Sequence, residues 1–194
     1  MKPMLRFIAV AAVFFAITGC LMPERIENRV RYMDPNTPPQ ITVIWHNISS
    51  DAKNEQELKK DFEELIKNPD STGTDIFIGF EKDIIIKEWQ VYVEDGKINL
   101  YVSGIPQTGQ FEDITSNGER MIVLDMEEAG VVETNGKLLK TDENYIIVWP
   151  ESLKEISWSN RLRTDESDID WIRWEQNRPK LLKMFETYKQ QRGK

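Results

Sequence analysis

The chain has 194 residues, 40% of them hydrophobic, with 25 Lys and Arg against 33 Asp and Glu. This length and apolar content suit one folded domain with a modest remainder, and they exclude a wholly disordered chain. A net charge of -8 argues against a general nucleic-acid binder, which needs a basic surface. The single Cys and single His exclude a disulfide framework, a Cys-rich zinc site, a CxxC redox pair and a metal site built on two histidines.

The first 20 residues have the organisation of a bacterial export signal. Lys2 and Arg6 give a positive start. Phe7–Ile17 is an unbroken apolar run, too short for a membrane-spanning helix, which takes about 20 residues. The run leads into the motif ITGC at 17–20, which resembles the lipobox of bacterial lipoproteins. We therefore expect residues 1–19 to be a signal peptide.

The lipobox resemblance implies a lipid anchor on Cys20. In that family the Cys sulfur receives a diacylglyceryl group, the peptide is cut before the Cys, and the new N-terminus is usually acylated with a fatty acid such as palmitate. The only Cys of the chain stands at this position. Leu21 follows it, where Asp would retain a lipoprotein of enteric bacteria in the inner membrane, so the outer membrane is favoured if the host has one. The alternative is a buried free Cys after a chance apolar segment.

Residues 20–40 are expected to form a tether. They contain four prolines: Pro23, Pro35, Pro38 and Pro39. Proline at this density predicts an extended, semi-rigid spacer that lifts a folded body off the membrane. In the alternative interpretation, Ile26–Tyr32 adds an edge strand to that body.

The predicted body, residues 41–158, begins with a strand. Ile41–Ile48 is apolar, rich in β-branched residues and bounded by Pro and Ser, which is typical of a strand. His46 lies on it. No Cys, second His or GxSxG serine accompanies His46, so a half-buried structural role is favoured over catalysis.

A helix is predicted next, over Asp51–Lys67. Leu58, Phe62 and Leu65 recur there at the i, i+4, i+7 spacing of a buried helix face. Ser50 or Asp51 is expected to cap its start and Asn68-Pro69 to end it.

The following region predicts antiparallel strands. Asp75–Phe80 is one strand, and Ile84–Glu94 and Lys97–Gly104 form a hairpin about Asp95-Gly96, because a two-residue turn needs positive φ and Gly supplies it. The turn fixes the register, so that one face is apolar and the other amphipathic. The expected pairs are Val93 with Ile98, Val91 with Leu100, Trp89 with Val102, Tyr92 with Asn99, Gln90 with Tyr101 and Glu94 with Lys97.

Further turn signals extend this pattern. Asn117-Gly118 precedes a strand at Glu119–Met126, and Asn135-Gly136 separates Val131–Thr134 from Lys137–Lys140. Further strand candidates are Tyr145–Trp149, which Pro150 ends, and Ile156–Trp158. We therefore predict an α+β fold: an antiparallel meander, curved or barrel-like, with one N-terminal packing helix and a C-terminal helical segment.

One part of the body resembles a known domain. The segment GVVETNG at 130–136, followed by NYIIVW at 144–149, is similar to a hairpin in the LppM-type domain of bacterial lipoproteins. That hairpin commonly runs Pro-Gly, apolar residues, Asn-Gly, a polar turn and a strand ending in Trp, whereas Ala129 stands here in place of the Pro. The resemblance covers about 20 residues. It implies an α+β domain with a curved sheet on the outer side of a membrane, and it supplies no catalytic residues.

Residues 159–194 are expected to form a helical extension. The first helix would run over Asp168–Asn177 from a capping-box spacing that starts at Ser167, and Pro179 would break or kink it. A second helix, capped by Asn177, would carry the stripe Leu181, Phe185 and Tyr188. The acidic start at 165–170 admits a calcium site, but it lacks the Gly and Glu of an EF-hand loop, so an acidic helix start is favoured.

Charge is divided unevenly along the chain. Residues 41–158 carry a net charge of -13, whereas residues 1–40 carry +2 and residues 159–194 carry +3. Arg178–Lys194 has six cations against one anion, Glu186. This segment predicts either a solvated helix end or a contact with anionic lipid head groups or an acidic partner.

Three functions are compatible with this sequence. The first is a lipid-anchored, non-enzymatic binding or structural protein of the envelope, anchored through acyl chains on Cys20 and facing a protein or glycan partner, with no cofactor and no metal. In that case Trp149 and Trp158 could form an aromatic binding platform, although core packing is the more common role. The second is a carrier of an apolar ligand or lipid in a cavity of the curved sheet.

The third is a cell-wall glycan hydrolase that uses two carboxylates. The candidate pairs are Glu63 with Glu64, Asp125 with Glu127, and Asp168 with Asp170. Because the chain has 33 acidic residues, such pairs also arise by chance, and the binding module is favoured.

Overall fold

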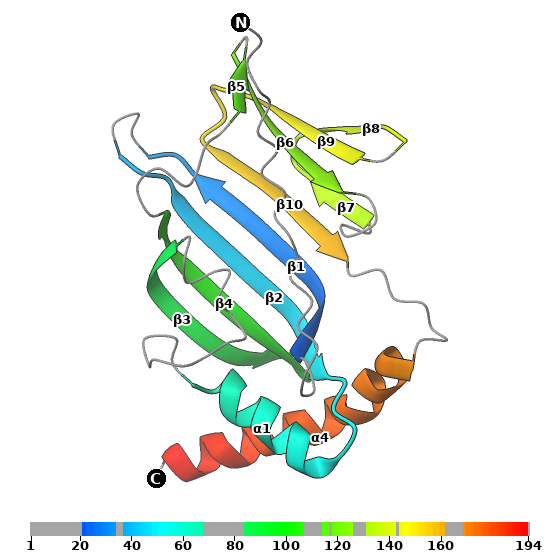
Figure 1. Ribbon diagram of the computed structural model, residues 1–194. Helices are drawn as coiled ribbons and strands as arrows, with labels where there is room; N and C mark the ends of the chain where they lie inside the picture. Colours follow the sequence, from blue (N-terminus) through cyan, green and yellow to red (C-terminus); the bar gives the residue numbers. More distant parts are fainter. Residues whose placement is uncertain are drawn as a thin grey trace, which may run out of the picture.

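The computed structural model describes residues 21–33, 37–67, 84–106, 114–116, 118–125, 131–142, 144–161 and 169–193. Within them lie two antiparallel sheets and two helices (Figure 1). The strands are β1 (Leu21–Arg31), β2 (Gln40–Ser50), β3 (Ile84–Glu94), β4 (Lys97–Pro106), β5 (Ile114–Ser116), β6 (Glu119–Asp125), β7 (Val131–Thr134), β8 (Lys137–Lys140), β9 (Asn144–Pro150) and β10 (Glu155–Arg161). The helices are α1 (Glu55–Leu65) and α4 (Ile169–Arg192).

The α+β class is confirmed, but the described strands form two open sheets and not one meander or barrel. One sheet has the order β3-β4-β2-β1-β10-β7 and the other β5-β6-β9-β8. Several predicted features lie outside the described residues: the signal peptide at 1–19, Cys20, the stop at Asn68-Pro69 and the strand Asp75–Phe80.

Strand β1 corrects the predicted tether. Residues 21–31 of the expected spacer form a strand inside the six-stranded sheet, paired with β2 on one side and β10 on the other. The alternative prediction, an edge strand at Ile26–Tyr32, is right that this region forms a strand. It is wrong about the position, because β1 lies inside the sheet and not at its edge. Alternation explains the strand: Ile26 and Val30 pack in the core, whereas the odd-numbered residues Arg25, Glu27 and Arg29 face the polar side.

The β3–β4 hairpin has the predicted register. All six expected pairs, from Glu94 with Lys97 to Trp89 with Val102, are present. Asp95 and Gly96 both have positive φ, at 51° and 69°, which is the geometry of the primed two-residue turn. The apolar face is buried at Ile98, Leu100 and Val102. Local turn chemistry and alternation therefore determine this hairpin.

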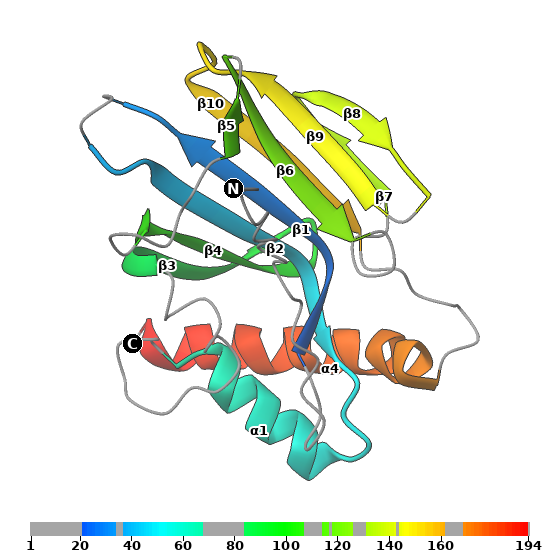
Figure 2. The same cartoon turned by 45° about the horizontal axis from the view of Figure 1, so that its top comes forward.

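One face of the six-stranded sheet carries two hydrophobic clusters. Residues opposite one another in register lie on the same face, so Val43 on β2 shares its face with Val102 on β4 and Trp158 on β10. At one end of this face α1 and α4 pack on the sheet, and at the other end the four-stranded sheet packs on it (Figure 2). Trp45 contacts both clusters.

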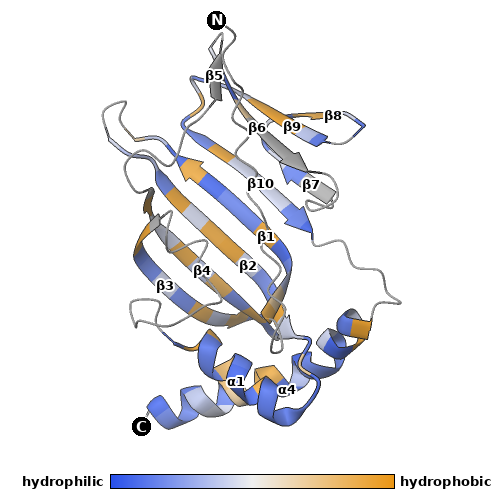
Figure 3. Cartoon of the chain, viewed as in Figure 1, coloured by the Kyte–Doolittle hydropathy of each residue, from blue (hydrophilic) through white to orange (hydrophobic). Residues whose placement is uncertain are grey.

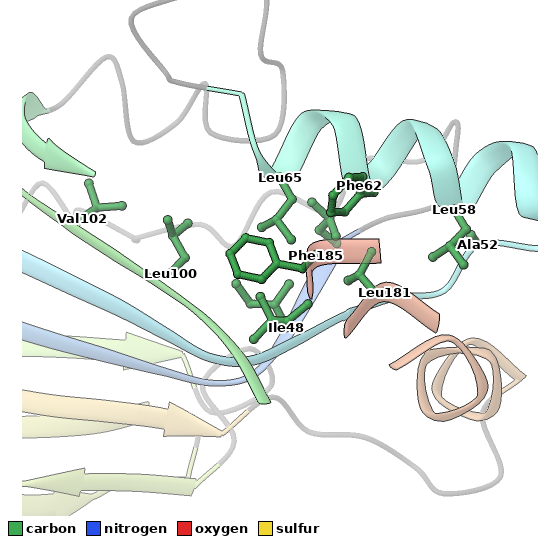
Figure 4. Packing of buried hydrophobic residues seen from close by; sticks show 11 residues of the cluster. Ile48, Ala52, Leu58, Phe62, Leu65, Leu100, Val102, Leu181 and Phe185 are labelled. Carbon is green, nitrogen blue, oxygen red and sulfur yellow. The ribbon is translucent and has the colours of Figure 1, made fainter. Parts of the chain in front are cut away.

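The helix-side cluster is built around α4. Figure 4 shows Phe185 of α4 pointing in among the side chains of α1 and β2. Leu65, Leu100 and Leu181 in this cluster are fully buried. Burial of a side chain of this size contributes about 1.5–3 kcal/mol, so the cluster stabilises both helices, neither of which has a strongly apolar composition (Figure 3).

Asn47 changes which residues of β2 face the core. Its φ of 52° is rare for a residue other than glycine. Before it, odd-numbered residues such as Val43 and Trp45 face the clusters, and after it Ile48 does so. The backbone N–H of Asn47 donates to Asn99 Oδ1 at 2.9 Å, which holds this conformation.

The Asn135-Gly136 turn does not form the expected hairpin. β7 pairs with β10 in one sheet, whereas β8 pairs with β9 in the other, so the turn carries the chain between the sheets. Asn135 Oδ1 accepts hydrogen bonds from Trp149 Nε1 (2.7 Å) and from the backbone N–H of Ser157 (2.9 Å). A Cβ on Gly136 would lie 2.5 Å from the Trp149 indole, so only glycine fits there.

Helix α1 is shorter than predicted and has a different cap. Asn54, not Ser50 or Asp51, accepts from the backbone N–H of Glu57 at 2.9 Å. Glu57 reaches back to the Lys53 N–H at 2.8 Å. Ser50 is still in β2, where its hydroxyl donates to Asp61 and accepts from the Ala52 N–H.

Helix α4 is one continuous helix, which corrects the prediction of two helices; of the two predicted effects of Pro179, a break or a kink, the break is wrong. Its buried residues, Trp174, Asn177, Leu181 and Phe185, continue on both sides of the proline. Proline removes one helical hydrogen bond at a cost of about 3 kcal/mol, and packing on both sides offsets that loss. Asn177, expected as a cap, instead donates from Nδ2 to the carbonyls of Ser50 and Ala52.

Candidate functional site

The predicted anchor position adjoins the folded body directly. Cys20 itself is outside the described residues, and the next residue, Leu21, is the first of β1. Leu21 is 7% exposed and packs in the helix-side cluster. One residue further on, the Met22 carbonyl accepts a hydrogen bond from Trp174 Nε1 of α4 at 2.6 Å. The body is therefore ordered from the residue after Cys20, with no spacer between them.

A charged cluster lies on the polar face of the six-stranded sheet. Its members are Arg25, Glu27 and Arg29 of β1 and His46 of β2, and we call it the Glu27 cluster. Glu27 Oε1 accepts from Arg29 Nε at 2.6 Å, and His46 Nε2 lies 3.1 Å from Glu27 Oε2. Arg25 reaches both Glu27, at 3.9 Å, and Glu133 of β7, at 3.4 Å. Strand register brings these side chains together, since Arg25 lies opposite His46.

The electrostatics of this cluster suit an ionised carboxylate. Burial acts to raise the pKa of Glu27, but hydrogen bonds from Arg29 and His46 outweigh burial and hold the pKa below its usual value. A general acid needs a raised pKa, whereas the pKa of Glu27 is shifted in the opposite direction. His46 is half-buried, as expected, and its partner is the Glu27 carboxylate. The cluster can bind charged or hydrogen-bonding groups through the exposed Arg side chains at its rim.

A second network surrounds Glu24 at the point where β2 changes face. Asn47 Nδ2 donates to Glu24 Oε2 at 2.6 Å, Arg161 Nη2 lies 2.8 Å from Oε1, and Lys97 Nζ lies 3.9 Å from Oε2. The hydrogen bond from Asn47 is the main reason that the pKa of Glu24 is lowered, against the opposing effect of burial, and both cations add to the lowering. Four strands meet in this network, so its first role is to hold the sheet together.

Among the described residues, the most buried carboxylate is one that the sequence analysis does not predict as a site. Asp61 of α1 is fully buried, and Ser50 Oγ donates to its Oδ2 at 2.5 Å. Burial raises the pKa of Asp61 to about 6, against the effect of the Ser50 hydrogen bond. Its other oxygen, Oδ1, has no hydrogen-bond partner. The sequence held a signal for this position, since Asp61 falls between Leu58 and Leu65 on the buried stripe of α1.

The predicted carboxylate pairs are not brought together as catalytic pairs where they are described. Glu63 and Glu64 lie on α1 and pair separately with Lys59 and Lys60. Asp170 pairs with Arg173 at 2.9 Å. The side chain of Asp125 and the residues Glu127 and Asp168 lie outside the described part, as does most of the acidic segment 165–170.

Trp149 and Trp158 are core residues and not a surface platform. Trp149 is fully buried and Trp158 is 9% exposed, and their ring centroids are 5.9 Å apart. Both belong to the cluster between the two sheets. The expectation that core packing is their role is confirmed.

Within the ranges stated above, no three His, Cys, Asp or Glu side chains are placed to hold a metal ion together. Of the two described helices, neither combines the length and hydropathy required to cross a bilayer. Compared with known proteins, the chain matches no protein-family model and no curated protein.

Proposed function

We propose that this chain is a lipid-anchored lipoprotein of the bacterial cell envelope that acts as a non-enzymatic binding or structural module. The observation that carries the proposal is the motif ITGC at 17–20, behind a positive start and a short apolar run, with the only Cys of the chain at its end. A thiol at that position is what diacylglyceryl transfer requires.

The position of the folded body adds support for a surface role. Because Leu21 is already buried in the core, an anchored protein would rest on the membrane at the helix end of the sheet. The polar face with the Glu27 cluster would be offered to the aqueous compartment. Its exposed rim includes Arg29, whose side chain is 47% exposed, and Glu133, at 73%.

A metabolic label tests the anchor. Cells that produce the native chain, Cys20→Ala or the control Leu138→Ala are grown with a radioactive fatty acid, and the protein is then isolated. Native protein should carry the label and fractionate with membranes. The control should behave in the same way, because Leu138 is an exposed residue of β8 that lies far along the chain from the lipobox. Label that persists on Cys20→Ala would refute the anchor.

In-cell crosslinking tests the binding role. A photoreactive residue is placed at Arg29, on the polar face, and in a second strain at Lys59, whose side chain on α1 is 71% exposed. We expect a discrete envelope protein or glycan to be captured from position 29 and not from position 59. Capture of nothing from either position, or of the same mixture from both, would count against a binding module that uses this face.

A further inference from the structure

The first half of α4 exposes apolar side chains although the rest of its surface is polar. Ile169 is 59% exposed and Ile172 is 42% exposed, and both lie on the side of the helix opposite the buried Trp174. At 100° per residue the same outward stripe continues through Gln176, Lys180 and Lys183, all of them exposed. The stripe thus has apolar residues, then lysines, and no carboxylate. Figure 3 shows the apolar colour at the first turn of α4.

The tryptophans of this end of α4 lie away from the stripe. Trp171 is half-buried and stacks on Trp174, with ring centroids 4.4 Å apart and planes at 9°. Exposed aliphatic residues followed by lysines on one helix face are the composition of helices that lie in a membrane interface. The nearby carboxylates are paired with cations, Asp170 with Arg173 and Glu175 with Arg178, so they add little negative charge to the stripe.

The first half of α4 lies close to the predicted anchor position. The first strand starts beside α4, as Figures 1 and 2 both show. Trp174 Nε1 donates a hydrogen bond of 2.6 Å to the carbonyl of Met22, which is two residues after Cys20. Consecutive Cα atoms are about 3.8 Å apart, so an acyl group on Cys20 would enter the bilayer next to the first turns of α4. The neighbouring helix α1 has more carboxylates than the stripe of α4. Two of them, Glu63 and Glu64, are paired with Lys59 and Lys60.

We infer that the outward stripe of α4, from Ile169 to Lys183, docks on a phospholipid surface with anionic head groups beside the lipidated Cys20. This inference rests on the proposed lipid anchor. Ile169 and Ile172 enter the boundary between head groups and acyl chains, and Lys180 and Lys183 face the anionic phosphates. The docked helix fixes the orientation of the sheet relative to the membrane.

Quenching of tryptophan fluorescence by lipids with brominated acyl chains tests the contact. The full chain is purified from its membrane, its acylation is measured by mass spectrometry, and it is placed in vesicles of phosphatidylcholine and phosphatidylglycerol. The double variant Ile169→Asp with Ile172→Asp is compared with the control Leu138→Asp with Leu139→Asp. The control residues are 39% and 40% exposed but lie on β8, in the other sheet. Circular dichroism checks that each variant is folded.

We expect native protein and the β8 control to be quenched, and the α4 variant to lose quenching by about twofold or more, because the acyl anchor alone would not hold the helix in the interface. Vesicles of phosphatidylcholine alone should give less quenching than the anionic mixture. Absence of quenching in acylated native protein, or equal quenching in both double variants, would overturn the docking and leave the proposed anchor standing. A Cys20 without acyl groups would overturn both.

Discussion

Replacing Asp61 by Asn should stabilise the protein at neutral pH and remove a specific pH dependence. Asp61 is a fully buried carboxylate with one unpartnered oxygen, and burial raises its pKa from 3.8 to about 6. In the unfolded chain the group returns to its ordinary pKa. Between these two values the folded state holds more protons than the unfolded state, so the free energy of unfolding falls as pH rises.

The magnitude follows from the shift. A shift of about two pKa units corresponds to about 3 kcal/mol at about 1.4 kcal/mol per unit. The native protein therefore has this contribution in full below about pH 4, and loses it as pH rises through about 6. The Asp61→Asn variant would have no charge to bury at this position, so it should exceed native protein by up to about 3 kcal/mol near pH 8. A buried amide without a partner would reduce this gain by about 1–3 kcal/mol.

The assay is urea unfolding followed by tryptophan fluorescence at intervals between about pH 4 and pH 8, with native protein, Asp61→Asn and the control Glu63→Gln. The difference between native and Asp61→Asn should grow with pH. Glu24 and Glu27 have lowered pKa values, so they make the stability of both proteins rise with pH. Their contribution cancels when the stability of native protein is subtracted from that of Asp61→Asn. Glu63 is an exposed residue of the same helix, so its variant should follow native protein. A constant difference across the range would refute the reasoning.

Three further substitutions test other contacts. Asn177→Ala should destabilise the protein by about 2 kcal/mol in urea unfolding, because it leaves two buried backbone carbonyls without a donor; unchanged stability would contradict the role given to this residue. Asn135→Ala should cost about 1–3 kcal/mol and change the emission of Trp149, whose indole loses its acceptor, so an unchanged spectrum would argue against the contact. Leu21→Asp should destabilise the body by several kcal/mol, since it buries a charge, and a variant as stable as native protein would show that Leu21 is outside the core.

The result expected for Leu21 also bears on sorting. The sequence predicts that the residue after Cys20 is a sorting signal, and the structure places this residue in the helix-side cluster. A change of location in a Leu21→Asp variant would therefore mix sorting with misfolding. Fractionation of the native protein is the cleaner measurement of which membrane it occupies.

The sequence alone predicted those features that depend on neighbours along the chain. The β3–β4 register follows from Asp95-Gly96 and a period of two, and both signals act within a few residues of the turn. The α1 stripe follows in the same way, although its cap lies at Asn54 and not at Ser50 or Asp51. The lipobox is likewise a local pattern, and it stays a prediction.

Only the tertiary structure decided the features whose energy comes from distant partners. β1 is a central strand because β10, more than 100 residues later, pairs with it. Asn135 joins the two sheets because its side-chain oxygen, Oδ1, accepts hydrogen bonds from both Trp149 and Ser157. Pro179 stays within a helix because packing on both sides outweighs one lost hydrogen bond. Turn and helix signals reflect the local backbone preference. Strand neighbours and buried polar partners depend instead on which surfaces meet when the chain collapses, and a short stretch of sequence does not determine which surfaces meet.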